Sequence, residues 1–367
     1  MTNNALDSIE IADAADEIPW SQAPAEARRE QLGKLFVKRD IEERVVAAID
    51  SARRERLILP EAQNVVIIGE TGVGKSEIAK RYLAANPEYR DPETGCIVRP
   101  VLYVDVRNSS TPKGVAKAML RQLGLDDTAD DDDGKGWGAT SVSDLTHCAK
   151  KQMVGQQVEV ALLDEFHNTV TDNGAVRLNR IAEWVKDFAK SKRRTAAKPD
   201  GERNENIVFV LIGTRKVKNI VDPTVNAELA SITPYRVEID RYRYGSVAEK
   251  EEFRAFLNDL DYELPFDEDS RLGEPGLADK FHIATFGLLR QLGHIVTKAA
   301  DLAIEDGSNR IYEHHLHAAV ELKRGVLESH LMSEESQGDE RRVVSNPFTP
   351  PQLPVSEKPS RRRGWKG

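Results

Sequence analysis

The residues best suited to chemistry run from Gly69 to Ser76. They read Gly-Glu-Thr-Gly-Val-Gly-Lys-Ser and fit the phosphate-binding loop pattern G-x-x-x-x-G-K-[ST] at every fixed position. Glycines let successive backbone N–H groups turn toward a polyphosphate, and the N-terminus of a following helix adds partial positive charge. The pattern predicts a nucleotide site in which Lys75 reaches the β- and γ-phosphates and Ser76 ligates Mg²⁺. The predicted cofactor-binding residues are Gly69, Glu70, Thr71, Gly72, Val73, Gly74, Lys75 and Ser76.

The segments on either side of this loop support the prediction. Residues 64–68 are apolar and β-branched enough for a buried parallel strand, and residues 76–85 are good helix formers. Strand, glycine-rich loop and helix in that order distinguish a phosphate site from a turn that binds nothing.

Polar residues end two further apolar segments. Residues 160–163 lead into Asp164 and Glu165, and residues 207–212 lead through a glycine into Thr214. Parallel sheets place ligand-contacting groups at the carboxyl ends of their strands. We therefore expect Asp164 to hold Mg²⁺ through water and Glu165 to orient the water that attacks the γ-phosphate. Thr214 is expected to contact that water or the γ-phosphate, and its alternative role is that of a turn residue.

Strand-like and helix-like segments alternate over the first two thirds of the chain. Predicted strands cover 64–68, 99–106, 158–163, 207–212 and 236–239, and predicted helices cover 76–85, 113–123, 143–153 and 176–190. This alternation predicts an α/β fold, with a parallel five-stranded sheet flanked by helices. From residue 247 to about residue 328 the pattern is helical throughout, which predicts a small all-helical lid subdomain.

Composition divides the chain into four parts. Residues 1–38 are predicted to be an acidic flexible arm with one helix near 25–35, and residues 39–246 the nucleotide-binding domain. Residues 247–332 are predicted to be the helical lid. The tail, 333–367, holds five of the 17 prolines and no core-forming periodicity, so we expect it to be disordered.

The overall composition of the 367 residues excludes several classes of protein. With 40% hydrophobic and 31% charged residues, and no apolar run long enough to span a bilayer, the chain is expected to be a soluble globular protein without membrane segments. Six acids precede the first basic residue, Arg28, which argues against a secretory or transit peptide. Two cysteines are too few for a disulfide framework, and the cytoplasm is the expected compartment. The net charge of −9 includes an acidic loop at 126–133 and the acidic arm, so a local DNA-binding patch stays compatible with the sequence.

Taken in order, these motifs resemble those of an AAA+ ATPase. Gly69 to Ser76, Leu163 to Asn168, Leu211 to Thr214 and Gly287 to Arg290 look like the Walker A, Walker B, sensor 1 and sensor 2 elements. More narrowly, residues 35–325 resemble the TniB/TnsC group of transposition regulators, which are relatives of MuB. The narrower features are Arg-Pro-Val-Leu-Tyr-Val at 99–104 before a Thr-Pro-Lys helix start, the Asp-Glu-x-His-Asn form of Walker B, and the segment 287–307.

This resemblance implies an ATP- and Mg²⁺-dependent regulator of DNA transposition. Such proteins bind duplex DNA through its backbone, form homo-oligomeric rings or helical filaments, and link a target-selection protein to a transposase. Sensor 2 maps onto Arg290. Relatives often carry an arginine where this chain reads Leu-Ala-Ser-Ile at 229–232, so the arginine finger that acts on the neighbouring subunit is assigned to Arg236, with Arg215 as the second candidate.

The candidate DNA contacts lie at a predicted helix start. Ser110, Thr111 and Lys113 combine hydroxyls with a basic side chain, which suits phosphate oxygens rather than base edges; the alternative is an ordinary helix cap. A basic cluster at 190–194 could serve the same purpose or simply end a helix favourably.

Other polar clusters are given structural roles. The Glu-His-His-Leu-His run at 313–317 is expected to be a solvated helix face rather than a metal site, and His167 to fix the turn after the Walker B strand. The triple arginine at 361–363 is expected to be a solvated tail or a nonspecific anion-binding end, with partner docking as the alternative.

Other function classes stay open. A STAND-like signalling or defence NTPase is one alternative, and a replication-initiator or helicase-loader ATPase is another. A small-molecule kinase is disfavoured, because it needs neither the Asp164–Glu165 pair nor Thr214.

Overall fold

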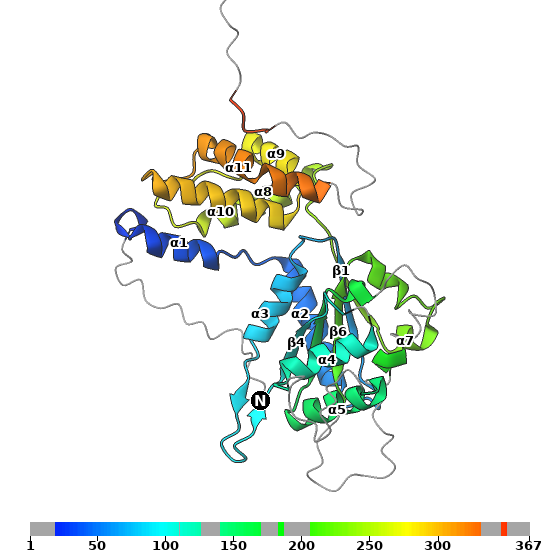
Figure 1. Ribbon diagram of the computed structural model, residues 1–367. Coiled ribbons are helices and arrows are strands. Elements are labelled where there is room, and N and C mark those ends of the chain that lie inside the picture. The colour runs from blue at the N-terminus through cyan, green and yellow to red at the C-terminus, as the bar shows by residue number, and fades with distance from the viewer. Residues whose placement is uncertain are drawn as a thin grey trace, which may run out of the picture. The chain divides into compact units, whose positions relative to one another are not determined.

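Five parallel strands form the sheet of the computed structural model (Figure 1). The structure describes residues 19–109, 111–125, 140–169, 183–186, 206–331 and 346–350. The strands are β1 (Val65–Gly69), β4 (Val101–Asp105), β5 (Val160–Asp164), β6 (Val208–Gly213) and β7 (Tyr235–Ile239). Their order is β4-β5-β6-β1-β7, and every pairing is parallel. The predicted fold class is confirmed, and each strand end lies within two residues of its predicted position.

Alternate residues of β1, β4, β5 and β6 face two different cores. Val66 and Ile68 of β1 pack in one core and Val65 and Ile67 in the other, because successive side chains of a strand point to opposite faces. Helices α4 (Pro112–Gln122) and α5 (Val142–Gly155) supply the first core, and α2 (Asp40–Glu55) and α3 (Lys75–Ala84) supply the second. Every residue of β1, β5 and β6 is buried, which explains why these strands are apolar up to Asp164 at the end of β5.

The chain divides into two compact units. The sheet unit contains residues 38–241 together with 288–290. The helical unit contains the described parts of residues 1–37, 242–287 and 291–367. Its helices are α1 (Ala25–Lys34), α8 (Val247–Tyr262), α9 (Pro275–Thr285), α11 (Glu313–Leu331) and, from residue 291 onward, α10 (Leu289–Glu305).

Several short elements escape sequence analysis. These are the antiparallel hairpin of β2 (Tyr89–Arg90) and β3 (Ile97–Val98), the helix α7 (Ala227–Ser231), and the 3₁₀ turns η1 (Trp20–Gln22), η2 (Phe166–Thr169) and η3 (Arg215–Asn219). Elements of two to five residues are too short to show a period. Most of the predicted helix 176–190 lies outside the described residues, within which 183–186 are helical. The 126–133 loop, the 190–194 cluster, Ser110 and the 361–363 arginines also lie outside them.

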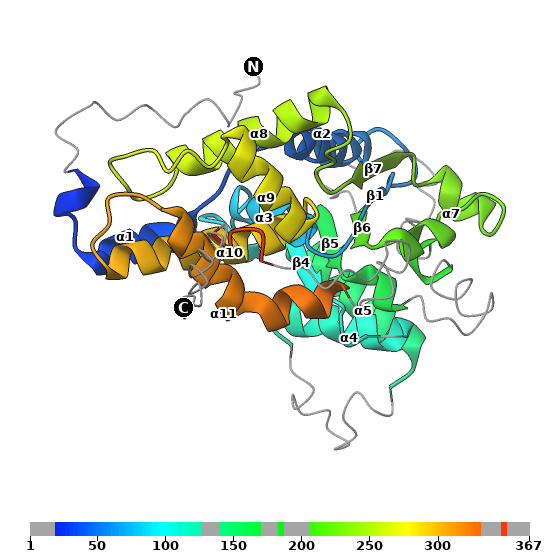
Figure 2. The ribbon, with the colours of Figure 1, turned by 90° about the horizontal axis from the view of Figure 1, so that it is seen from above.

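The described part of the N-terminal arm belongs to the helical unit, where α1 lies alongside α10 (Figure 2). The Asp267 carboxylate accepts hydrogen bonds from the backbone N–H groups of Trp20 and Ser21, at 2.6 and 2.9 Å. Arg28 is only 7% exposed; its guanidinium lies 4.8 Å from the ring centre of Phe266 and donates to the Pro265 carbonyl. From residue 19 onward the segment is thus packed, where the sequence suggests a flexible arm, because a buried arginine anchors it.

Part of the predicted disordered tail is also folded. Residues 346–350 pack within the helical unit, and the side chains of Asn346 and Phe348 are 6% and 1% exposed. The expectation of disorder therefore does not hold for these five residues. Among the described helices, none has the length and apolar character needed to cross a bilayer.

Candidate nucleotide site

The loop from Gly69 to Ser76 joins β1 to α3 and has the backbone that a phosphate cradle needs. Gly72 and Gly74 have φ angles of 92° and 98°, a region open to glycine at no steric cost. The Lys75 side chain is almost fully buried, and its ammonium donates to the carbonyls of Gly69 and Glu70, each at 2.7 Å. The lysine is thus held inside the loop, at the first turn of the helix.

Asp164 and Thr214 lie at the same sheet edge as this loop. Gly213 of β6 pairs with Ile68 of β1, so the next residue, Thr214, stands level with the start of the loop. Asp164 ends β5, the neighbour of β6. Three consecutive strands therefore bring the glycine loop, the threonine and the acid pair together, as the sequence predicts for this edge.

The Thr214 hydroxyl has an unsatisfied hydrogen-bonding capacity. Thr214 is 2% exposed, and its Oγ1 has no hydrogen-bond partner among the described residues. Leaving a buried hydroxyl unsatisfied costs about 1–3 kcal/mol, so such groups call for a missing partner. A phosphate oxygen or a water at the sheet edge fits that need.

Tyr103 holds the Asp164 carboxylate and was missed by sequence analysis. Asp164 is 2% exposed; its Oδ2 accepts a hydrogen bond from the Tyr103 hydroxyl at 2.7 Å, and its Oδ1 accepts one from the Glu165 N–H at 2.8 Å. Burial, followed by the hydrogen bond to Asp164, raises the pKa of Tyr103 well above its usual value, so the phenol stays a donor. The available signal was a single hydroxyl-bearing side chain in the otherwise apolar run that precedes Asp105.

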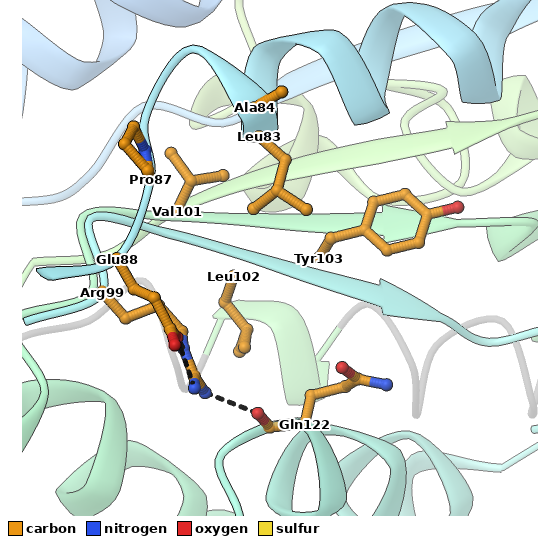
Figure 3. Close-up of a pocket in the computed structure, with 9 residues that line it drawn as sticks. All are labelled: Leu83, Ala84, Pro87, Glu88, Arg99, Val101, Leu102, Tyr103 and Gln122. Carbon is orange, nitrogen blue, oxygen red and sulfur yellow. Dashed lines mark hydrogen bonds and ion pairs between the residues drawn. The ribbon is translucent and has the colours of Figure 1, made fainter. Parts of the chain in front are cut away.

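The ring of Tyr103 also lines a cavity of about 410 Å³ beside the sheet (Figure 3). The cavity lies between the end of α3, β4 and α4, with apolar walls that include Leu83 and Leu102. Arg99 crosses its other end, pairing with Glu88 and donating to the Gln122 carbonyl. The cavity therefore touches the residue that positions Asp164, but it contains none of the predicted nucleotide-binding residues.

Glu165 has a strained backbone. Its φ angle is 58°, in the left-handed region that costs a non-glycine residue about 1–2 kcal/mol. Its carboxylate lies 3.4 Å from Nδ1 of His167, and its carbonyl accepts hydrogen bonds from the backbone and side chain of Asn168. Strain of this kind persists where the surrounding structure fixes a side chain for a purpose.

Two arginines contact the glycine loop through its carbonyls. The Arg290 backbone N–H donates to the Gly72 carbonyl at 2.9 Å, while its side chain is exposed. Arg39, a residue that the sequence analysis does not name, donates to the Val73 carbonyl at 3.2 Å and pairs with Glu42 at 3.1 Å. The backbone of Arg290, the predicted sensor 2 residue, thus contacts the loop.

The two arginine-finger candidates differ in how they are held. The Arg236 guanidinium, on the edge strand β7, donates to the Val221 carbonyl at 2.7 Å. The Arg215 side chain is 66% exposed, and its nearest acidic oxygen is that of Asp240 at 3.9 Å. Neither contact involves the residues of the glycine loop.

The remaining predicted contacts lie on other elements. Thr111 caps α4, its hydroxyl accepting the Gly114 N–H at 3.2 Å, and Lys113 lies in the first turn of that helix. The helix-cap alternative therefore describes Thr111, although its hydroxyl hydrogen stays available to an acceptor.

The histidine-rich start of α11 forms a hydrogen-bonded cap. His315 Nδ1 accepts the Tyr312 N–H at 3.0 Å, which leaves Nε2 as the protonated nitrogen that donates to Asp306 at 2.8 Å. This hydrogen bond contributes to lowering the pKa of Asp306, after that from Ser308. Asp306, His314 and His315 lie close enough for a metal, but both nitrogens of His315 are already engaged. Glu313 instead pairs with Lys280 at 2.7 Å.

Residues 38–221 match the protein family described as AAA domain. The chain belongs to this family. The match covers the glycine loop, the acid pair and Thr214, and it ends before β7. Among curated proteins none matches the sequence.

Solved structures share the fold of this AAA domain protein. ORC2 of Aeropyrum pernix in its ADP form is 16% identical, with a TM-score of 0.53 over 80% of this chain and 72% of that one. The same protein in ADPNP–ADP complexes gives 15% identity and a TM-score of 0.51, over 78% and 69%. Cdc6p of Pyrobaculum aerophilum is 12% identical, with a TM-score of 0.53 over 80% and 70%. At these identities the likeness shows the fold alone.

Replacing Glu165 by glycine should stabilise the protein. We expect Glu165→Gly to raise the free energy of unfolding by about 0.5–1 kcal/mol, because glycine accepts the left-handed backbone. The matched control Glu165→Gln keeps that backbone and should leave stability within about 0.5 kcal/mol of the parent. Chemical denaturation of both variants measures the difference. A glycine variant less stable than the glutamine variant would show that the backbone at this position is not strained.

Proposed function

We propose that this AAA domain protein is an ATP-hydrolysing regulator of DNA transposition that oligomerises on duplex DNA and links target selection to a transposase. The observation that carries the ATPase part is the sharing of one sheet edge by the glycine loop, the Asp164–Glu165 pair and the unsatisfied Thr214 hydroxyl. The transposition part rests on the resemblance of the sequence to the TniB/TnsC group.

In this proposal the loop binds the phosphates of ATP and two oxygen ligands serve Mg²⁺. Lys75, now donating to two loop carbonyls, would donate to phosphate oxygens instead. Ser76 would ligate Mg²⁺ directly and Asp164 through water; oxygen donors are those that this ion prefers. Each Asp164 oxygen accepts one hydrogen bond and keeps capacity for another, so Tyr103 orients the carboxylate without blocking it. When bound, Mg²⁺ would neutralise charge on the phosphates.

Hydrolysis would then use Glu165 and Thr214. Glu165 would orient the attacking water and take its proton as the bond between the γ-phosphorus and the bridging oxygen breaks, releasing ADP and phosphate. Thr214 would donate its hydroxyl to the γ-phosphate or to that water, which would satisfy the buried oxygen. Arg290 would contact the bound nucleotide. Its backbone already binds Gly72, and it lies in the first turn of α10, so nucleotide binding could change the position of that helix.

A replication-initiator-like ATPase is the second candidate. It is favoured by the fold shared with ORC2 and Cdc6p. The two functions can be distinguished by how they select DNA: a sequence-specific initiator would contact base edges, whereas a transposition regulator of the proposed kind contacts the backbone.

Two substitutions should separate nucleotide binding from hydrolysis. Lys75→Ala should abolish ATP binding, because the loop loses its only ammonium. Glu165→Gln should bind ATP as the parent does and turn over at least about a hundredfold more slowly, because water activation is lost. Calorimetric titration with ATP and steady-state phosphate release measure the two effects. Equal loss of ATP affinity in both variants would contradict the role of Glu165.

Binding to duplex DNA should require ATP, show little sequence preference and weaken steeply with salt. Lys113→Ala should lower the slope of log affinity against log salt by about 0.9, the value for one phosphate contact. Lys80→Ala, an exposed lysine on α3 at the other face of the sheet, is the matched control and should leave the slope unchanged. Fluorescence anisotropy on unrelated duplexes of one length provides the measurement. Strong preference for one duplex, with no nucleotide required, would favour the initiator-like function.

A trans-acting arginine should reveal itself by complementation between inactive variants. Arg236→Ala and Lys75→Ala proteins, each inactive alone, should recover part of the ATPase activity when mixed, since some interfaces then pair an intact site with an intact finger. Such a finger contributes about 10³-fold or more to turnover, so the recovery is measurable. Arg215→Ala is tested in the same way. If only Arg215→Ala complements Lys75→Ala, the exposed arginine is the finger.

A further inference from the structure

Residues 346–348 pack against α9 and α11 of the helical unit through side-chain contacts like those of a bound peptide. The Phe348 ring is 1% exposed and lies edge-on to Phe281 of α9, with ring centres 5.2 Å apart. The Lys280 ammonium lies 6.0 Å from the centre of the same ring. An aromatic side chain buried this completely is the kind of anchor that dominates the binding energy of peptides.

Asn346 adds specificity to this anchor. Its amide nitrogen donates to the His317 carbonyl at 3.0 Å and to the Glu321 carboxylate at 2.9 Å, both on α11. Its amide oxygen accepts the Phe348 N–H at 3.0 Å, which closes an Asx turn and points the chain back toward α9. Both amide hydrogens and the amide oxygen are therefore used, a pattern that neither aspartate nor alanine can reproduce.

We propose that Lys280, Phe281, His317 and Glu321 form a docking face for the Asn-Pro-Phe turn, and that a second copy of this chain can supply the turn. The hydrogen bonds and ring contacts described above are made by Asn346 and Phe348, two residues apart in the chain. The 14 residues from 332 to 345 join it to α11. A connection of that length spans up to about 45–50 Å when extended, which reaches a neighbouring molecule as well as its own.

Exchange of this segment would be symmetric and nearly neutral in energy. Every copy carries one turn and one docking face, so moving the turn to a neighbour replaces each contact by an identical one. Within one molecule the tether keeps the turn at an effective concentration near the millimolar range, which favours the internal contact until copies are held side by side. Assembly on DNA, if the proposed function holds, would provide that condition; the docking itself does not depend on it.

The docking face can be tested with a peptide and the full-length chain. The receptor is the Asn346→Ala/Phe348→Ala protein, whose docking face is vacant, and the probe is a fluorescent peptide of residues 343–352. We expect saturable binding to this receptor, and at least about tenfold weaker apparent binding to the parent chain, whose own turn competes. The Phe348→Ala peptide should not bind, and the Asn346→Asp peptide should bind at least about tenfold more weakly, since it loses two donors and meets the Glu321 carboxylate. No binding to the vacant receptor, or equal binding of the Phe348→Ala peptide, would overturn the proposal.

Exchange between copies is tested by photo-crosslinking in the full chain. Benzoylphenylalanine in place of Phe348 should crosslink to α9 or α11 of its own molecule in dilute solution. The share of crosslinked dimers should rise with protein concentration, with the same helices labelled in the second copy. Crosslinks confined to single molecules at every concentration would overturn the role of the second copy. Nucleotide binding by the same proteins checks that the sheet unit stays folded, because the glycine loop belongs to that unit.

Discussion

Parallel pairing around β1 is the constraint on which the sheet unit depends. Because β6 and β7 both run in the same direction as β1, the glycine loop, Thr214 and the residues after β7 emerge at a single edge. Parallel strands need long crossovers, and those crossovers supply the helices that bury both faces. The parallel direction of the strands therefore has two effects. It places helices over both faces of the sheet, and it brings the glycine loop and Thr214 to the same edge.

The same edge concentrates local features that oppose stability. Thr214 has a buried hydroxyl without a partner among the described residues, and Glu165 has a left-handed backbone. Lys75 is buried and donates to carbonyls of the loop that it belongs to. Strained backbones and unsatisfied polar groups lower the stability of a fold, and they occur mostly at functional sites. Burial of the apolar side chains of β1, β5 and β6, the strands that precede these residues, offsets the lost stability.

Sequence reasoning succeeds here where the information is local. The glycine loop, the five strands and the acid pair each lie within a few consecutive residues, and the fully buried strands β1, β5 and β6 contain a single charged residue, Asp164 at the end of β5. Strand order, by contrast, depends on pairing between distant segments, and so do the contacts of Tyr103 with Asp164 and of Arg39 with Val73, across 61 and 34 residues. Folding of residues 346–350 was hidden for the same reason, since nothing within that segment shows which helices receive Phe348. The roles assigned to the site residues all stay predictions. They are those of the glycine loop, Asp164, Glu165, Thr214, Arg236, Arg290, Thr111 and Lys113.

The division of the chain into two units also determines which unit can fold first during synthesis. The sheet unit is inserted in the helical unit, which takes its helices from both sides of it. Arg28 of α1 precedes its partner Pro265 by 237 positions. At about 5–20 residues per second, a ribosome needs on the order of 10 to 50 s to make that stretch. Helix α1 is thus made well before the residues that it packs against, and the nucleotide-binding sheet can form while the helical unit is still being synthesised.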